Sequence, residues 1–317
     1  MRVLVAGATG VLGRQLVPLL SSVGHDVVGL ARSAGRADAL AEAGARLVTA
    51  DALDAAALRR AVLEAEPEAV VHLLTAIPAD FHPRRLDEAF RTTNRLRTEA
   101  TRTLVDAAAA VGARRFVSQG VAFAYDPAGP STATEDEPLW REPPRVAAPL
   151  VDALRELERR TADAGGLTLR LGHLYGPGTV YDRDGAITTI VRARRLPLVG
   201  GGGALFSFTH THDAATAVVT ALDRDLAGVL NVVDDEPVPV ATWLPEFARM
   251  LGAPPPRRVP TALARLAVGP WGTAWMTRLR GADNARARLS LDWRPGYPSW
   301  REGFERELGA SGVRRAA

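Results

Sequence analysis

The 317 residues, of which 47% are hydrophobic and 24% charged, are enough for one elaborate globular domain or two closely packed ones. The sequence has no cysteine, which excludes disulfides, thiolate nucleophiles and cysteine-based metal sites, and we expect no metal centre. The net charge of +3 is too small to favour nucleic acid and no stretch approaches the roughly 18 apolar residues of a membrane-spanning helix, so we expect a cytoplasmic protein that binds neither nucleic acid nor a membrane.

The chain begins with a short apolar strand, residues 3–5, that leads directly into a glycine-rich turn. Gly7 allows a tight turn, Gly10 removes a Cβ where a pyrophosphate must approach, and Gly13 lets the next helix pack closely. That helix, from about residue 11 to residue 20, points its first amides at the anion. A tight turn without a ligand is the alternative, but the triplet follows a strand and opens a helix. We therefore predict a dinucleotide site formed by Gly7, Thr9, Gly10, Val11, Leu12 and Gly13.

A second buried strand, residues 26–32, ends about 20 residues beyond the glycine turn, where such folds contact the adenosine ribose. An acidic residue there would select NAD through the 2′-hydroxyl. The sequence instead has Arg32 and Ser33, with Arg36 a turn later. A guanidinium can pair with a 2′-phosphate through two hydrogen bonds. We therefore predict NADP(H) rather than NAD(H), with a solvated arginine as the alternative.

The third and fourth strands are expected over residues 46–51 and 69–76. Asp51 ends the third strand beside Ala52 and either caps the turn or accepts a hydrogen bond from the adenine amino group, while Asp54 is the predicted N-cap of the next helix. His72 lies inside the fourth apolar run, which indicates a packed core histidine. The end of the fourth strand is expected to line the crevice beside the nicotinamide ribose, through Leu74, Thr75 and Ala76.

A long helix is expected over residues 85–111, and its Asn94 is counted in the dinucleotide site. A fifth strand over residues 115–120 precedes a polar loop, residues 126–144, whose length suggests an active-site cover. A helix over residues 150–164 and a sixth strand over residues 167–170 follow. Strands that alternate with helices in this way predict an α/β fold with a doubly wound parallel Rossmann sheet.

The second half of the sequence has shorter elements. Strands are expected near residues 205–208 and 229–232, and helices over residues 212–222 and 241–251. We expect a dinucleotide-binding Rossmann domain over residues 1–175 and a smaller, interleaved substrate lobe over residues 176–317, packed on the carboxyl edge of the sheet. A homodimer is compatible with this organisation.

In combination, these segments resemble the extended short-chain dehydrogenase/reductase superfamily, in its NAD-dependent epimerase/dehydratase branch. The similar segments are residues 7–13, the turn at Asp51, residues 72–76, Asn94, residues 115–117, 170–178 and 208–213, and the C-terminal residues 280–303. The resemblance covers essentially the whole chain. It implies a nicotinamide dinucleotide in the N-terminal domain and a small-molecule substrate under the C-terminal lobe.

The resemblance breaks at the catalytic residues. The superfamily pattern is a Ser or Thr after the fifth strand and then Tyr-x-x-x-Lys on the next helix, where the Tyr exchanges a proton and the Lys lowers its pKa. This sequence contains no lysine, the Ser/Thr position is occupied by Val121 or Gly120, and residues 147–154 include no tyrosine. The usual proton machinery is therefore missing.

Three functions remain open. The chain is an atypical NADP(H)-dependent reductase or dehydrogenase with a relocated acid, or a non-redox isomerase, dehydratase or cyclase on the same fold, or a non-catalytic NADP-sensing protein. Polar residues near the carboxyl ends of the fourth to sixth strands favour an enzyme: Thr75, Gln119, Tyr125, His173 and Tyr175.

The proton donor is sought among these residues. His173 is the first candidate, because relatives commonly place a substrate-facing Asn in this position and an unperturbed imidazole pKa near 6.5 suits neutral pH. A histidine hydrogen-bonded into its own loop is the alternative. Tyr125 is the second candidate, although the superfamily usually has a structural tyrosine there, and Gln119 is the third.

Overall fold

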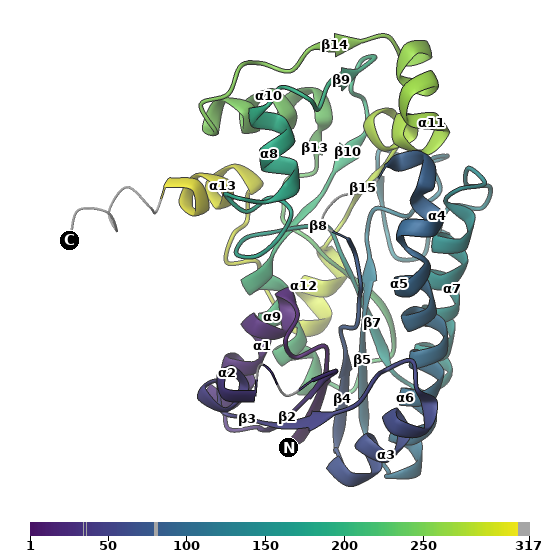
Figure 1. Cartoon of the computed structure of the whole chain (residues 1–317), viewed down its shortest axis with the longest axis vertical. Coiled ribbons are helices and arrows are strands. Elements are labelled where there is room, and N and C mark those ends of the chain that lie inside the picture. The colour runs from purple at the N-terminus through teal and green to yellow at the C-terminus, as the bar shows by residue number, and fades with distance from the viewer. Residues whose placement is uncertain (34, 36, 79–81, 310–317) are drawn as a thin grey trace.

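The computed structural model describes residues 1–33, 35, 37–78 and 82–309. Its centre is a seven-stranded parallel sheet of order β12-β7-β5-β4-β1-β2-β3, with α-helices packed on both faces (Figure 1). The sheet confirms the predicted doubly wound α/β fold. Its strands are β1 (Arg2–Ala6), β2 (Asp26–Ala31), β3 (Ala45–Thr49), β4 (Ala69–His72), β5 (Arg115–Val121), β7 (Leu167–Leu171) and β12 (Gly228–Val232).

The side chains of β1 alternate between the two faces of the sheet, and each face is covered by a layer of helices. Val3 and Val5 enter one apolar cluster, while Leu4 and Ala6 enter another on the opposite face, because successive strand side chains point to opposite sides. The first cluster is covered by α1 (Val11–Ser22), α9 (Thr211–Leu222) and α12 (Ala285–Leu291). The second is covered by α3 (Ala55–Ala65) and α6 (Thr101–Ala110), and α7 (Ala148–Asp163) packs against β5 and β7.

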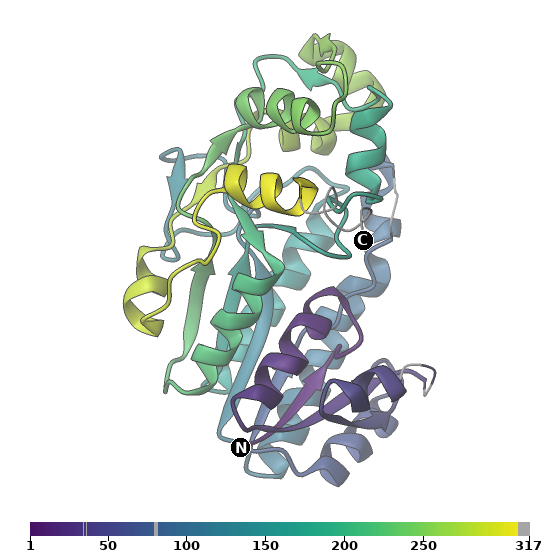
Figure 2. The same ribbon diagram turned by 90° about the vertical axis from the view of Figure 1, so that its left-hand side faces the viewer.

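The second half of the chain contributes to both parts of the molecule. β12 pairs with β7 in the main sheet, and α9 packs against α1, so the predicted strand at residues 229–232 belongs to the sheet rather than to the lobe. Figure 2 shows the lobe beyond one end of the sheet. Its further elements are β8 (His173–Tyr175), α8 (Ala186–Arg192), β9 (Leu198–Val199), β10 (Leu205–Phe206), β11 (Phe208–His210), β13 (Val238–Pro239), α10 (Val240–Met250), β14 (Arg258–Val259), α11 (Thr261–Thr277), β15 (Gly281–Ala282) and α13 (Trp300–Gly309).

The prediction of a single helix over residues 85–111 is wrong. The segment is η2 (Pro83–Arg85), α4 (Leu86–Ala89), α5 (Arg91–Arg95), the π-helical turn η3 (Leu96–Ala100) and then α6. Phe90, with φ −98° and ψ 4°, separates the first two α-helical pieces. Residues 91–110 are helical without interruption, so periodicity missed the break at Phe90 and the π turn within the helix.

The polar loop at residues 126–144 is anchored to the lobe. The Arg280 guanidinium pairs with Glu137 and donates to the carbonyl oxygen of Asp126 at 3.2 Å. Glu135 also accepts the backbone N–H of Asn231 on the edge strand β12. The loop contains β6 (Thr132–Ala133), which pairs with β15. The predicted role of the loop as an active-site cover stays a prediction. Within the described ranges, no helix is both long and apolar enough to cross a bilayer.

Candidate functional site

The glycine turn has the geometry expected of a phosphate-binding loop. Gly7 has φ +98°, a conformation that favours glycine, and the Gly10 N–H donates to the Gly7 carbonyl oxygen at 2.9 Å. A Cβ on Gly13 would lie 2.3 Å from that carbonyl oxygen, so α1 can pack this closely only with glycine there. A Cβ on Gly10 would meet only the Gly7 oxygen, at 3.2 Å, and its side chain would project outward.

The start of α1 leaves donors at this turn. Gly10 is the N-cap and has no side chain, so the first amides of α1, from Val11 onward, lack an intrahelical partner. Gly10 is exposed, Val11 is half-buried and Leu12 is buried beneath. The turn therefore offers backbone donors of the kind that bind a pyrophosphate, and the pyrophosphate contact itself stays a prediction.

The adenosine end is less defined. Arg32 and Ser33 follow β2 and are exposed. Arg36 lies outside the described residues. The Asp51 carboxylate accepts the Leu53 N–H at 2.9 Å, so one of its oxygens serves the local turn. The predicted NADP contact of Arg32 and the predicted adenine contact of Asp51 stay predictions.

The helix after this turn begins as predicted. The Asp54 side chain accepts the N–H groups of Ala56 and Ala57, each at 3.0 Å, which confirms Asp54 as the N-cap of α3. Ala52, beside Asp51, is buried. The backbone around the expected adenine position is therefore fixed by local hydrogen bonds.

The expected nicotinamide end lies in the chain after β4, a strand that is shorter than predicted and ends at His72. Thr75 is exposed, Leu74 is half-buried, and the Ala76 N–H donates to Thr93 Oγ1 at 3.0 Å, which ties this segment to α5. His72 is a core residue, as predicted: its Nε2 lies 3.0 Å from Thr101 Oγ1, and burial lowers its pKa to about 4.

The environment of His173 contradicts the pKa reasoning that made it the first candidate. Its ring is stacked between Phe123, with ring centroids 4.6 Å apart, and Phe206, at 3.9 Å, and is perpendicular to Trp275 at 5.8 Å between centroids. Burial in this aromatic cluster lowers the pKa of His173 to about 3. The imidazole is neutral at pH 7 and holds no proton to donate as imidazolium.

Tyr125 has a structural position. It is buried, its hydroxyl donates to Asn231 Oδ1 at 2.7 Å, and the Arg170 guanidinium lies 4.8 Å from its ring centroid. Burial raises the pKa of its phenol. These contacts do not fit a proton donor facing a substrate. Gln119 is half-buried inside β5, two residues before the strand ends, and its predicted role is untested.

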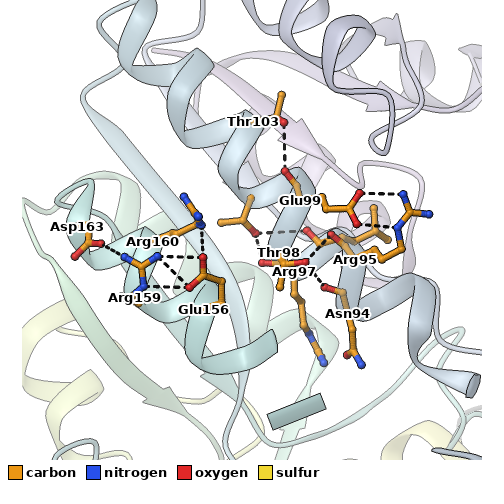
Figure 3. Close-up of polar contacts among 12 residues, drawn as sticks. Asn94, Arg95, Arg97, Thr98, Glu99, Thr103, Glu156, Arg159, Arg160 and Asp163 are labelled. Atoms are coloured by element: carbon orange, nitrogen blue, oxygen red, sulfur yellow. Dashed lines mark hydrogen bonds and ion pairs between the residues drawn. The ribbon is translucent and has the colours of Figure 1, made fainter. Parts of the chain in front are cut away.

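Two polar side chains on α5 and η3 lack partners, and only one of them was expected at the site (Figure 3). Asn94 Oδ1 and Arg97 Nη1 are buried and make no hydrogen bond within the described part of the chain. Arg97 is 4% exposed, and burial lowers its pKa to about 10. Sequence reasoning missed Arg97, although its place on the buried face between Leu96 and Ala100 was a usable signal.

Comparison with known proteins identifies the family of this chain. A model of the NAD dependent epimerase/dehydratase family matches residues 3–232. The chain belongs to this family. It is 52% identical over 312 residues to a 3-diazoavenalumate denitrifying reductase of a Streptomyces species, an alignment covering 97% of this chain and 100% of the relative. The family assignment confirms the resemblance to the extended short-chain dehydrogenase/reductase superfamily.

Solved structures share the fold of this family member. A UDP-glucose 4-epimerase of Thermotoga maritima, with UDP-glucose, has a TM-score of 0.76 at 18% identity, covering 98% of both chains. The human epimerase family protein SDR39U1, with NADPH, has a TM-score of 0.73 at 19% identity, covering 98% of this chain and 99% of that protein. At these identities the likeness shows the fold alone.

Proposed function

We propose that this family member is an NADPH-dependent reductase that removes a diazo group as dinitrogen and leaves hydrogen in its place. The observation that carries the proposal is the 52% identity, over nearly the full length of both chains, to a relative named as a denitrifying reductase of a diazo compound. Arg32, exposed directly after β2, supports the choice of NADPH over NADH.

The chemistry suits a chain without the usual proton donor. When bound, the reduced nicotinamide supplies a hydride. For a diazonium group the exchange is R–N₂⁺ + H⁻ → R–H + N₂: the carbon–nitrogen bond breaks and dinitrogen leaves. This exchange takes no proton from the protein, whereas reduction of a carbonyl group needs one at oxygen. A sequence without lysine, and so without Tyr-x-x-x-Lys, can therefore support it.

The side chains around His173 suggest how the substrate is held. Phe123 and Trp275 are half-buried beside the neutral imidazole, whose ring is stacked between Phe123 and the buried Phe206. Flat apolar groups of this kind favour a planar conjugated substrate by stacking and exclude water. Under this proposal His173 positions the substrate and exchanges no proton.

The test uses purified protein, NADPH and an arenediazonium carboxylate labelled with ¹⁵N. We expect loss of NADPH absorbance and release of ¹⁵N₂ in equal amounts, measured by headspace mass spectrometry, with a Gly10→Val variant as the control that lacks cofactor. NADPH that binds without being oxidised would favour a sensor. Oxidation with the label retained in the organic product would show that a different reduction takes place.

A further inference from the structure

Arg97 differs from the other buried arginines of the described chain in having no counter-charge. Arg170 donates to both oxygens of Glu158, at 2.7 and 2.8 Å, and Arg280 pairs with Glu137. Each of the three is 4% exposed. Arg97 forms no ion pair with any described residue, and its Nη1 has no hydrogen-bond acceptor. A buried guanidinium N–H that lacks an acceptor is unfavourable, and a ligand that supplies an acceptor relieves that cost.

The position of Arg97 directs it to the carboxyl edge of the sheet. The helical segment that carries it follows β4, runs back along the sheet, and is tied at its start to the chain after β4 by the contact between Ala76 and Thr93. Helical side chains lean toward the N-terminus of their helix, so Arg97 reaches back toward that edge. Thr101, whose hydroxyl donates to the Arg97 carbonyl oxygen at 2.7 Å, lies 3.0 Å from Nε2 of His72, the last residue of β4, so Arg97 starts close to the end of that strand.

Asn94 supplies an independent second observation. It lies one turn before Arg97, and both side chains extend to the same side of the helix, whereas Arg95 and Glu99 pair on another side (Figure 3). Asn94 Oδ1 is a buried acceptor without a donor, and Arg97 Nη1 is a buried donor without an acceptor. A hydroxyl group satisfies both atoms at once, because it donates one hydrogen bond and accepts others. The π turn at η3 adds weight, since such turns are frequent at functional sites.

We propose that Asn94 and Arg97 together bind a hydroxyl of the nicotinamide ribose. This rests on the proposed function only in taking the ligand to be a nicotinamide dinucleotide. Arg97 Nη1 would donate a hydrogen bond to the ribose hydroxyl oxygen, and that hydroxyl would donate a hydrogen bond to Asn94 Oδ1. The guanidinium stays protonated at neutral pH, so the contact positions the cofactor and transfers no proton. A hydroxyl of the substrate has the same chemistry, and binding measured without substrate separates the two sources.

The experiment replaces Arg97 by methionine, which keeps much of the length and removes the charge. For the ligand-free Arg97→Met protein we expect a higher melting temperature, because an unpaired buried cation is gone. We also expect NADPH to bind about tenfold more weakly or worse, measured by calorimetry without substrate. Affinity for 2′,5′-ADP, which lacks the nicotinamide ribose, should be unchanged.

Arg95→Met is the matched control, since it removes an exposed arginine of the same helix, and it should alter neither quantity. A lower melting temperature with unchanged NADPH affinity would show that Arg97 is structural and overturn the proposal. Unchanged NADPH affinity with a raised KM for the substrate would show that Arg97 contacts the substrate. That result would overturn the ribose assignment. None of these binding measurements depends on diazo reduction, so the inference can fail while the proposed function stands, and the reverse.

Discussion

The two ends of the proposed dinucleotide site differ in what forms them. The expected phosphate end is made by backbone, with Gly7 at φ +98° and the first amides of α1 without intrahelical acceptors. The proposed nicotinamide and substrate end is made by buried side chains, such as His173 between aromatic rings and Arg97 without a counter-charge. The first end depends on glycines that are neighbours in sequence. The second depends on which segments the fold brings together, and changes at the two ends should therefore fail in different ways.

The largest effect is expected from Gly13→Ala. The new Cβ would lie 2.3 Å from the Gly7 carbonyl oxygen and 2.5 Å from that of Ala8, so the turn or α1 must move. We expect a loss of about 3 kcal/mol or more in the free energy of unfolding, together with loss of cofactor binding. Urea unfolding and calorimetry measure the two effects. Gly201→Ala is the control, because nothing lies within 4 Å of a Cβ there. Equal stability of the two variants would refute the close packing.

Gly10→Val should separate binding from folding. A Cβ at Gly10 meets only one carbonyl oxygen, at 3.2 Å, and its methyl groups would occupy the space above the turn. We expect at least a hundredfold loss of NADPH affinity, about 2.7 kcal/mol, with a melting temperature close to that of the unchanged protein. Normal binding by calorimetry would mean that the pyrophosphate does not approach this turn.

This difference also explains what could be predicted from the sequence. The sheet, the glycine turn and the Asp54 cap follow from local patterns, and all three are present. The pKa of His173 could not be predicted, because its aromatic neighbours Phe123, Phe206, Phe208 and Trp275 come from distant segments. The place of β12 in the sheet could not be predicted either, because its pairing with β7 depends on the topology of the whole sheet.

A third prediction tests the adenosine end, where a single exposed side chain is expected to act. If Arg32 pairs with the 2′-phosphate, Arg32→Ala should remove about 1.5 to 3 kcal/mol of the preference for NADPH over NADH. Titrations of both cofactors against both proteins measure this. Affinity for NADH should change little, which is the internal control. Equal affinities for the two cofactors in the unchanged protein would contradict the assignment.

The buried imidazole at the other end should make stability depend on pH. The pKa of His173 is about 3 in the folded protein and near 6.5 when the chain is unfolded, so on acidification the unfolded chain takes up a proton first. The contribution of the neutral His173 to the free energy of unfolding is therefore fully present well above pH 6.5 and is lost as the pH drops. The loss from this residue is about 2 kcal/mol by pH 5. His72, with a pKa of about 4, adds to the slope. In a His173→Gln variant the pH slope of urea unfolding should be smaller, and an unchanged slope would show that His173 is protonated in the folded state.

The smallest effect is expected from Tyr125→Phe, which removes only the hydroxyl that donates to Asn231. The Asn231 oxygen loses that donor in a buried region, so we expect a loss of about 1 kcal/mol in the free energy of unfolding. The ring keeps its place beneath Arg170, and cofactor affinity should be unchanged. If the hydroxyl is structural, turnover changes by less than about threefold at every pH. A tenfold fall, the lower end of a general-acid contribution, would instead make Tyr125 the proton donor. The catalytic end would then contain an acid after all, and a carbonyl substrate would fit the site as well as a diazo compound does.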